Sequence, residues 1–118
     1  MISDRDRRYL RYIVYAIALI QRRTSAGYAA FLADVDCQDA VLWRLETLAE
    51  AAMRLSQEIK DRHPEIPWRA IWGFRNVAAH AYLDIKLDDV WEIVEQHLAA
   101  LDRAAQRELN DEPSDARG

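Results

Sequence analysis

Apolar residues recur every three or four positions along most of the chain, the spacing that places side chains on one side of an α-helix. The first such stripe predicts a helix over residues 3–24. Ser3 or Asp4 can cap its start, and Gly27 helps to end it. Its apolar side consists of Leu10, Ile13, Val14, Ile17 and Ile20. The chain is therefore expected to open with an amphipathic helix.

The longest apolar stripe predicts a second helix that starts near Asp34 or Asp36 and runs to about Arg62. Its members are spaced alternately by four and three: Val41, Leu45, Leu48, Ala52, Leu55 and Ile59. This regular seam indicates a helix packed lengthwise against another helix. Between the two helices, Phe31 and Leu32 are expected to pack back onto the bundle, which leaves room for a short additional helix.

Two prolines, Pro64 and Pro67, interrupt the pattern after the second helix. Pro67 suits the first turn of a following helix. That third helix, of about 13–15 residues, is marked by Trp68, Ile71, Trp72 and Val77. After a connector at residues 84–86, Asp88 can cap a last helix. Its expected buried stripe is Val90, Trp91, Val94, Leu98 and Leu101, and its expected wet face is Glu92, Glu95, Asp102, Arg103 and Arg107.

These patterns predict an all-α fold, an up-and-down bundle of four main helices with a possible short fifth. A length of 118 residues fits one domain, here residues 1–109, followed by a polar tail at residues 110–118. One cysteine excludes an intrachain disulfide, and Cys37 is expected to be a buried structural thiol. The sequence shows neither a secretion signal nor an apolar run that could span a bilayer, so a cytoplasmic location is expected.

The net charge of −4 is unevenly distributed along the chain. Residues 1–80 hold 12 Lys and Arg against 10 Asp and Glu, whereas residues 81–118 hold 4 against 10. An acidic protein of this kind can still present a basic face to nucleic acid. Four arginines of the first helix could form a rim that binds nucleic acid, or a solvated face paired with Asp4 and Asp6: Arg5, Arg7, Arg8 and Arg11.

The sequence lacks the usual catalytic constellations: a glycine-rich phosphate loop, a His-Glu-x-x-His pair and a nucleophile elbow. Its histidines, His63, His80 and His97, lie 17 residues apart, so no two share a helical face at the spacing of metal ligands. Neither a metal nor another cofactor is expected.

One stretch stands out, the octapeptide from Arg75 to Tyr82 at the end of the third helix. On a helix, Arg75 and Tyr82 lie within about 20° of each other, while Asn76 and His80 form a second stripe about 100° away. The two stripes border one polar strip. From spacing alone, the plainer interpretation is that the first two residues bond neighbouring helix ends and that His80 is a satisfied, partly buried histidine.

This octapeptide resembles the signature of the HEPN superfamily: Arg, often followed by Asn, then four to six residues and His. With Tyr82 two residues after His80, the motif resembles that of the HepT branch. The members of this branch are RNase toxins paired with an MntA-like minimal nucleotidyltransferase antitoxin. The resemblance extends over roughly residues 4–105 and includes residues 45–52, the link at residues 63–68 and the Val90-Trp91-Glu92 run. Ala49 departs from the Gly that relatives commonly carry, a change that is harmless within a helix.

The resemblance implies a metal-independent endoribonuclease, in which a ribose 2′-OH attacks the adjacent phosphate and leaves a 2′,3′-cyclic phosphate. His80 would transfer protons, Arg75 would clamp the phosphate, and Asn76 would orient His80 or hold a ribose or phosphate oxygen. Because one chain supplies one such histidine, the resemblance implies a homodimer with a composite active site.

The resemblance also implies that Tyr82 is a modification site, whose hydroxyl accepts AMP from the antitoxin. An AMP group beside His80 would block RNA by its bulk and negative charge. A core tyrosine whose hydroxyl caps a helix is the plainer alternative. For the whole protein, the alternative is a catalytically inactive helical module that binds a nucleotidyltransferase partner. A small-ligand-binding bundle has no support beyond the polar strip.

Overall fold

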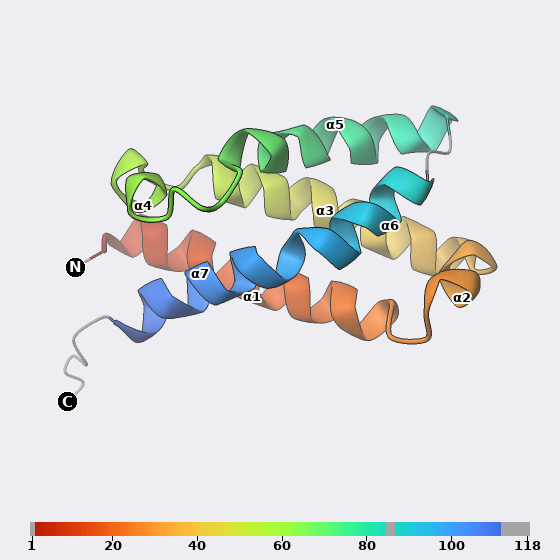
Figure 1. The fold of residues 1–118 in the computed structure, drawn as a ribbon, viewed down its shortest axis with the longest axis horizontal. Helices are drawn as coiled ribbons and strands as arrows, with labels where there is room; N and C mark the ends of the chain where they lie inside the picture. Colours follow the sequence, from red (N-terminus) through yellow and green to blue (C-terminus); the bar gives the residue numbers. More distant parts are fainter. Residues whose placement is uncertain (1, 85–86, 112–118) are drawn as a thin grey trace.

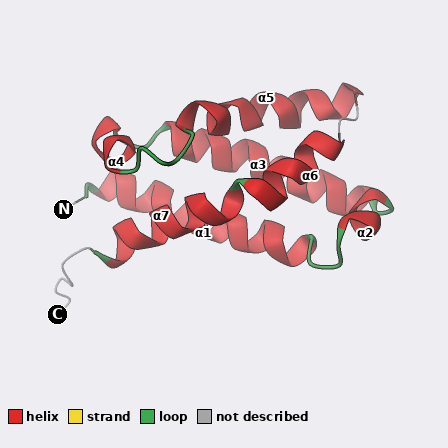
Figure 2. Cartoon of the chain, in the orientation of Figure 1, coloured by secondary structure: helices red, strands yellow, loops and turns green. Residues whose placement is uncertain are grey.

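The computed structural model describes residues 2–84 and 87–111, and the side chains of residues 77–84 lie outside this description. Seven helices and no strand are formed within the described residues (Figure 1; Figure 2). They are α1 (Asp4–Arg23), α2 (Tyr28–Leu32), α3 (Val35–Met53), α4 (Gln57–Arg62), α5 (Trp68–Asp84), α6 (Leu87–Gln96) and α7 (Leu98–Asn110). The predicted all-α bundle is confirmed, including the short helix between the first two long ones.

Four lengths of helix run along the bundle: α1, α3, α5 and the α6–α7 pair (Figure 1). α3 packs against both α1 and α5, while α7 packs against α1 and α6 packs against α5. The core between them is almost wholly apolar, and its fully buried large side chains include Ile13, Ile17, Leu45, Leu48 and Leu101. No helix in the described ranges is both long and apolar enough to cross a bilayer.

The first helix begins and ends nearly as the apolar pattern predicts. Ser3 caps it by accepting a hydrogen bond from the Asp6 amide at 3.0 Å. Four of the five predicted apolar positions are buried and Val14 is half-buried. Gly27 has φ +98°, a left-handed conformation that favours glycine, and it lies between α1 and α2.

The predicted second helix is broken, which corrects the single span to about residue 62. α3 starts after Asp34, whose carboxylate caps the Cys37 amide at 3.1 Å, and ends at Met53. A separate helix, α4, starts where Ser56 accepts from the Ile59 amide at 3.3 Å. The apolar spacing misses this break because Leu55, within the break, and Ile59, in α4, are both buried and continue the stripe.

The break between α3 and α4 is fixed by a buried acid from the first helix. Asp6 is only 5% exposed, and its Oδ1 accepts the Ser56 amide hydrogen at 2.9 Å. The same residue that supplies this amide also caps α4 with its hydroxyl. The corner therefore satisfies backbone groups that a continuous helix would have used internally.

The predicted last helix is also split, at His97, into α6 and α7. Of its expected stripe, Val90, Leu98 and Leu101 are buried, whereas Trp91 and Val94 are only half-buried. Ile93, which the pattern analysis left out, is buried instead. One more expectation is wrong: Phe31 packs into the core, but Leu32 is 43% exposed.

Candidate functional site

The helix that carries the Arg75–Tyr82 stretch is set in place by its first turn and its apolar side. Its first amide, that of Trp68, bonds the Ile66 carbonyl at 2.9 Å, and the Pro67 carbonyl accepts the Ile71 amide at 3.0 Å. Ile71 and Phe74 are both buried in the core. α5 continues to Asp84, two residues beyond Tyr82, so it is longer than the 13–15 residues predicted.

Arg75 is placed on the α3 side of this helix and remains half-exposed. Its Nε lies 3.6 Å from Glu50 Oε1, a separation longer than a hydrogen bond, and its side chain is 47% exposed. Its guanidinium carbon lies 5.3 Å from the centre of the Trp72 ring, a cation–π distance. The guanidinium is thus oriented by two neighbours without being enclosed by them.

Glu50 faces two guanidinium groups with a single carboxylate. Its Oε2 accepts a hydrogen bond from Arg54 Nε at 3.1 Å, while its Oε1 faces Arg75. Two positive charges against one negative charge leave a local surplus of about one unit. This part of the α3–α5 surface can therefore attract an anion such as a phosphate.

Asn76 lies next to Arg75 in the chain and is exposed. The four residues of the predicted polar strip belong to one uninterrupted helix, so their spacing along α5 is helical as expected. The side chains of His80 and Tyr82 lie outside the described residues. The pairing of Asn76 with His80 and of Arg75 with Tyr82 therefore stays a prediction.

Two neighbours of Arg75, Glu50 and Trp72, were not identified from the sequence. Trp72 lies three residues before Arg75 on the same helix, a spacing at which side chains meet, so this contact had a signal. Glu50 comes from α3, 25 residues earlier, and a contact of this kind depends on tertiary packing. Of the predicted pairs on the first helix, Arg7 pairs with Asp4 at 2.7 Å, but Asp6 is buried and its carboxylate accepts the Ser56 amide hydrogen instead.

The other histidines and the cysteine singled out in the sequence contact residues of the fold and lie outside the polar strip. His63 is 3% exposed, and its Nε2 lies 2.6 Å from Glu108 Oε2. The His97 ring lies 5.7 Å from that of Phe74. Cys37 is buried as expected, its thiol donates to the Arg23 carbonyl at 3.2 Å, and burial raises its pKa. Within the described ranges, no three His, Cys, Asp or Glu residues gather as metal ligands.

Comparisons with known proteins place this helix within a defined family. The family model "Ribonuclease HepT-like" matches residues 13–108, which include all of α5. A "Probable ribonuclease HepT" of Thermococcus cleftensis is 35% identical over 94 residues, 79% of this chain and 86% of that protein. A "Putative RNase" of Caldanaerobacter subterraneus subsp. tengcongensis is 27% identical over 107 residues, 90% of this chain and 96% of that protein.

No solved structure matches the chain significantly. The family match nevertheless spans most of the sequence and agrees with the helical fold, with the exposed Arg75–Asn76 pair and with the length of the relatives. The chain therefore belongs to the HepT-like ribonuclease family.

Proposed function

We propose that this chain is a metal-independent endoribonuclease, the toxin of a toxin–antitoxin pair. The observation that carries the proposal is Arg75 on α5, which is half-exposed and lies where positive charge exceeds negative charge. This residue falls within the segment matched by a ribonuclease family. The two relatives described above are both named as ribonucleases, which agrees with RNA as the substrate. The cleavage would occur at the polar strip formed by Arg75, Asn76, His80 and Tyr82.

The proposed reaction transfers a phosphoryl group within the RNA chain, from O5′ of one nucleotide to O2′ of the preceding one. A general base takes the proton of the ribose 2′-OH, the O2′–P bond forms, and the P–O5′ bond breaks. A general acid donates a proton to the leaving O5′, which leaves a 2′,3′-cyclic phosphate and a 5′-OH. An imidazole, with an ordinary pKa of about 6.5, can serve in either proton transfer near neutral pH.

In this scheme His80 transfers protons and Arg75 stabilises the negative charge that develops on the phosphorane. Arginine suits this role because its charge is permanent and its donors can bind two phosphate oxygens at once. Asn76 would orient His80 across one helical turn or bind a ribose or phosphate oxygen. A homodimer with two-fold symmetry would place a His80 from each copy at one site, one as base and the other as acid.

We further propose that Tyr82 is the control point of the enzyme. A phenol, with an ordinary pKa of about 10, is a poor base near neutral pH, so regulation suits it better than catalysis. An MntA-like nucleotidyltransferase antitoxin would transfer AMP from ATP to the Tyr82 hydroxyl: the Tyr O–P bond forms, the bond between the α- and β-phosphates breaks, and pyrophosphate leaves with the phenol proton passing to solvent. The attached AMP would add negative charge and bulk where the RNA phosphate binds. The modified chain would then be inactive.

The direct test compares the wild-type chain with His80→Ala and Arg75→Ala on RNA in the presence of EDTA. We expect both variants to lose cleavage, helical circular dichroism to be unchanged, and the wild-type products to end in a cyclic phosphate. Arg103→Ala is the matched control, because Arg103 is an exposed arginine of α7, away from the α3–α5 surface, and this variant should cleave like the wild type. A His80→Ala protein that cleaves at the wild-type rate would refute the site. A wild-type chain without RNase activity that still binds a nucleotidyltransferase would show an inactive module instead.

The control point is tested by intact mass after co-expression with the nucleotidyltransferase. We expect a mass increase of whole AMP units that is absent in Tyr82→Phe. An unmodified wild-type chain held tightly by its partner would contradict modification and favour neutralisation by masking.

A further inference from the structure

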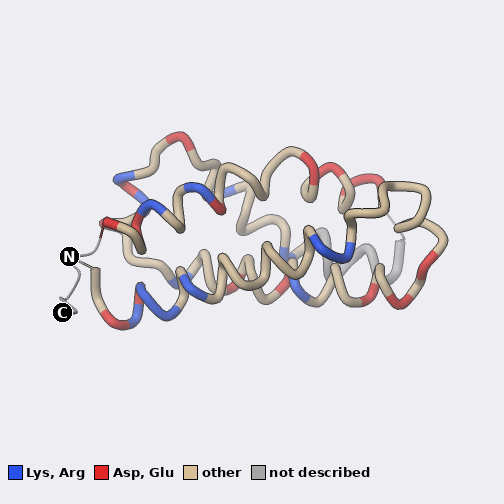
Figure 3. The backbone as a smooth tube through the Cα atoms, turned by 90° about the horizontal axis from the view of Figure 1, so that it is seen from below, with Lys and Arg blue, Asp and Glu red and all other residues tan. Residues whose placement is uncertain are grey.

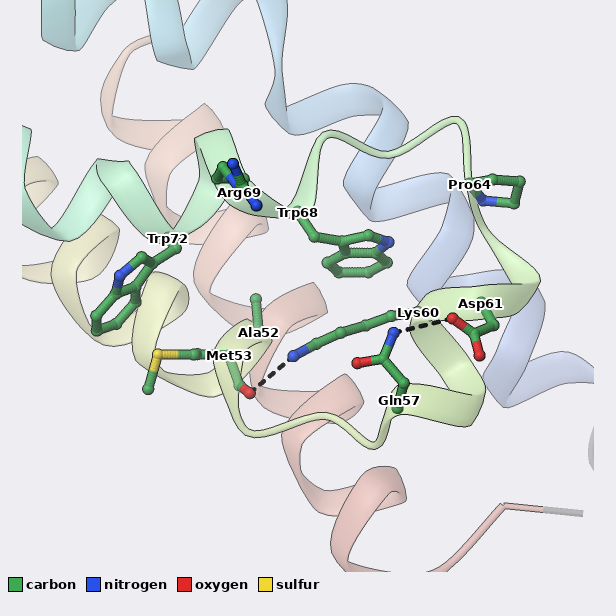
Figure 4. A pocket seen from close by; sticks show the side chains of 9 residues that line it. All are labelled: Ala52, Met53, Gln57, Lys60, Asp61, Pro64, Trp68, Arg69 and Trp72. Carbon is green, nitrogen blue, oxygen red and sulfur yellow. Dashed lines mark hydrogen bonds between the residues drawn. The ribbon is translucent and has the colours of Figure 1, made fainter.

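A groove lined by two tryptophans and two cations lies at the start of α5, on the same helix as the polar strip. It has a volume of about 490 Å³ and lies where α3, α4 and α5 meet. Trp68, Arg69 and Trp72 come from α5, and Lys60 comes from α4. In Figure 4, the Trp68 indole stands above the Lys60 side chain and the Trp72 indole lies further along α5. The groove is outside the residues to which the proposed cleavage assigns a role.

The aromatic rings of this groove are held in fixed orientations. The Trp68 Nε1 donates a hydrogen bond to the His63 carbonyl at 3.1 Å, which fixes the ring while leaving its face unused by that bond. Trp72 is held by the Arg75 guanidinium, 5.3 Å from its ring centre. Both indoles are only half-buried. Ring faces that are ordered in advance bind flat partners at a low entropic cost.

The cations of the groove are placed for a backbone that runs beside the rings. Lys60 Nζ donates to the Met53 carbonyl at 3.0 Å, which uses one of its three hydrogens. Arg69 is exposed. The one acid in the lining, Asp61, accepts a hydrogen bond from Gln57 Nε2 at 2.9 Å. Two cations and one acid give the groove a net positive charge.

The groove and the polar strip lie along the same helix, α5. Positions 69, 76 and 80 fall within about 40° of one another around the helix. Position 72 precedes position 80 by eight residues, or about 12 Å along the axis. A strand with one phosphate near Arg75 and Asn76 would therefore extend along the helix into the groove. The first turn of α1, in which Arg5 and Arg7 alternate with Asp4 and Asp6, lies at this same end of the bundle (Figure 1), whereas the opposite end carries mainly acidic segments (Figure 3).

We infer that this groove binds single-stranded RNA next to the scissile phosphate, with bases on the indoles of Trp68 and Trp72 and phosphates at Arg69 and Lys60. Aromatic faces beside a positive track are the combination by which proteins bind single strands without reading their sequence. The inference rests on the proposed ribonuclease function for its substrate. It adds a binding subsite that is separate from the cleavage residues and that contacts nucleotides next to the scissile phosphate.

The test measures binding of a fluorescein-labelled ten-nucleotide RNA in which every 2′-OH is methylated, so that the attacking hydroxyl is absent. We expect Trp72→Ala to weaken binding by about ten-fold and Trp72→Phe to retain most of it, since a phenyl ring still stacks. Trp43→Ala is the matched control, because Trp43 is 60% exposed on α3 and outside the groove. Its affinity should stay within about two-fold of the wild type.

The charge of the groove is tested by the salt dependence of the same binding. Arg69→Ala should lower the slope of log affinity against log salt by about 0.7, the value for one phosphate contact on a single strand. Arg103→Ala, an exposed arginine of α7, should leave the slope unchanged. Equal affinities and slopes for the groove variants and their controls would overturn the inference, as would a wild-type chain that binds no oligonucleotide.

Two further outcomes separate this inference from its premise. Groove variants that bind RNA like the wild type, in a chain whose cleavage depends on His80, would refute the groove and leave the proposed function standing. A wild-type chain that cleaves no RNA, but loses oligonucleotide binding in Trp72→Ala, would refute the proposed function and support the groove. A Trp72→Ala chain with unchanged RNA binding and a changed oligomeric state by ultracentrifugation would show a protein interface and overturn the inference.

Discussion

Two arginine–glutamate pairs in this protein use the same chemistry in opposite ways. Arg62 holds Glu108 through two hydrogen bonds of 2.8 and 3.0 Å, and the Glu108 side chain is 9% exposed. Arg75 lies 3.6 Å from Glu50, and both side chains are at least one-third exposed. A two-bonded, buried carboxylate fixes structure, whereas a long and open pair leaves its arginine available for another anion.

The surroundings of the two pairs sharpen the contrast. Glu108 also bonds buried His63, so the Arg62–His63–Glu108 cluster joins the end of α4 to α7. The three side-chain hydrogen bonds of Glu108 therefore belong to a single network. Glu50 is shared between Arg75 and Arg54. Breaking the Arg62–Glu108 pair should therefore lower the stability of the fold, and breaking the Arg75–Glu50 pair should change RNA cleavage.

The largest effect is expected from Arg75→Ala. Loss of a cation that stabilises the transition state should lower kcat/KM for RNA by at least about 100-fold. The free energy of unfolding should change by less than about 1 kcal/mol, because the pair with Glu50 is exposed. Cleavage kinetics and urea unfolding measure the two effects. A variant that unfolds easily but cleaves normally when folded would reverse the contrast between the pairs.

The next effect concerns the Arg62–His63–Glu108 cluster. Glu108→Ala leaves the Nε2 of buried His63 without its partner and should lower the free energy of unfolding by about 2 kcal/mol. Glu58→Ala is the matched control, since Glu58 bonds the same Arg62 from a side chain that is 73% exposed. Glu58→Ala should lower the free energy of unfolding by less than about 0.5 kcal/mol. Equal losses for the two would remove the distinction between buried and exposed partners.

A pH series should isolate the same cluster. The hydrogen bond from Arg62, followed by that from His63, holds the pKa of Glu108 below its ordinary value of 4.5. A lowered folded-state pKa stabilises the protein above the ordinary value and ceases to do so as the pH falls below it. The stability gap between wild type and Glu108→Gln should therefore shrink as the pH decreases from about 5. A gap that widens on acidification would contradict this assignment.

The smallest effect is expected from Glu50→Gln. Without its carboxylate competitor, Arg75 should bind phosphate somewhat better, which should lower KM for RNA by about two- to five-fold and change kcat little. Steady-state kinetics at low salt would detect this. A loss of cleavage as large as that of Arg75→Ala would mean that Glu50 positions Arg75 and does not merely compete for it.

The sequence predicted the fold well wherever burial follows helical spacing. The apolar seam from Val41 to Ile59 is buried throughout. Of the two cap candidates for the first helix, Ser3 forms the cap, and the second helix starts near Asp34, one of the two predicted positions. The break before α4 was missed because it depends on Asp6, a residue 50 positions away from the amide that it binds. The break at His97 likewise keeps the apolar stripe nearly in phase, so spacing alone carries no sign of it.

The candidate site was predictable only as a linear motif. The sequence identified Arg75 and Asn76, and their exposure on α5 agrees with a role at the surface. The pairing of Arg75 with Glu50, and the groove formed by α3, α4 and α5, arise from contacts between helices. Helical spacing describes one helix at a time, so it gives no access to such contacts.

The packing of α7 against α1 brings the first and last helices of the chain together. During synthesis, one apolar side of α1 has no partner until α7 has been made. At about 5–20 residues per second, synthesis of the 87 residues from the end of α1 at Arg23 to the end of α7 at Asn110 takes about 4–17 s. For several seconds of synthesis, therefore, the side of α1 that packs on α7 is open to association with other chains.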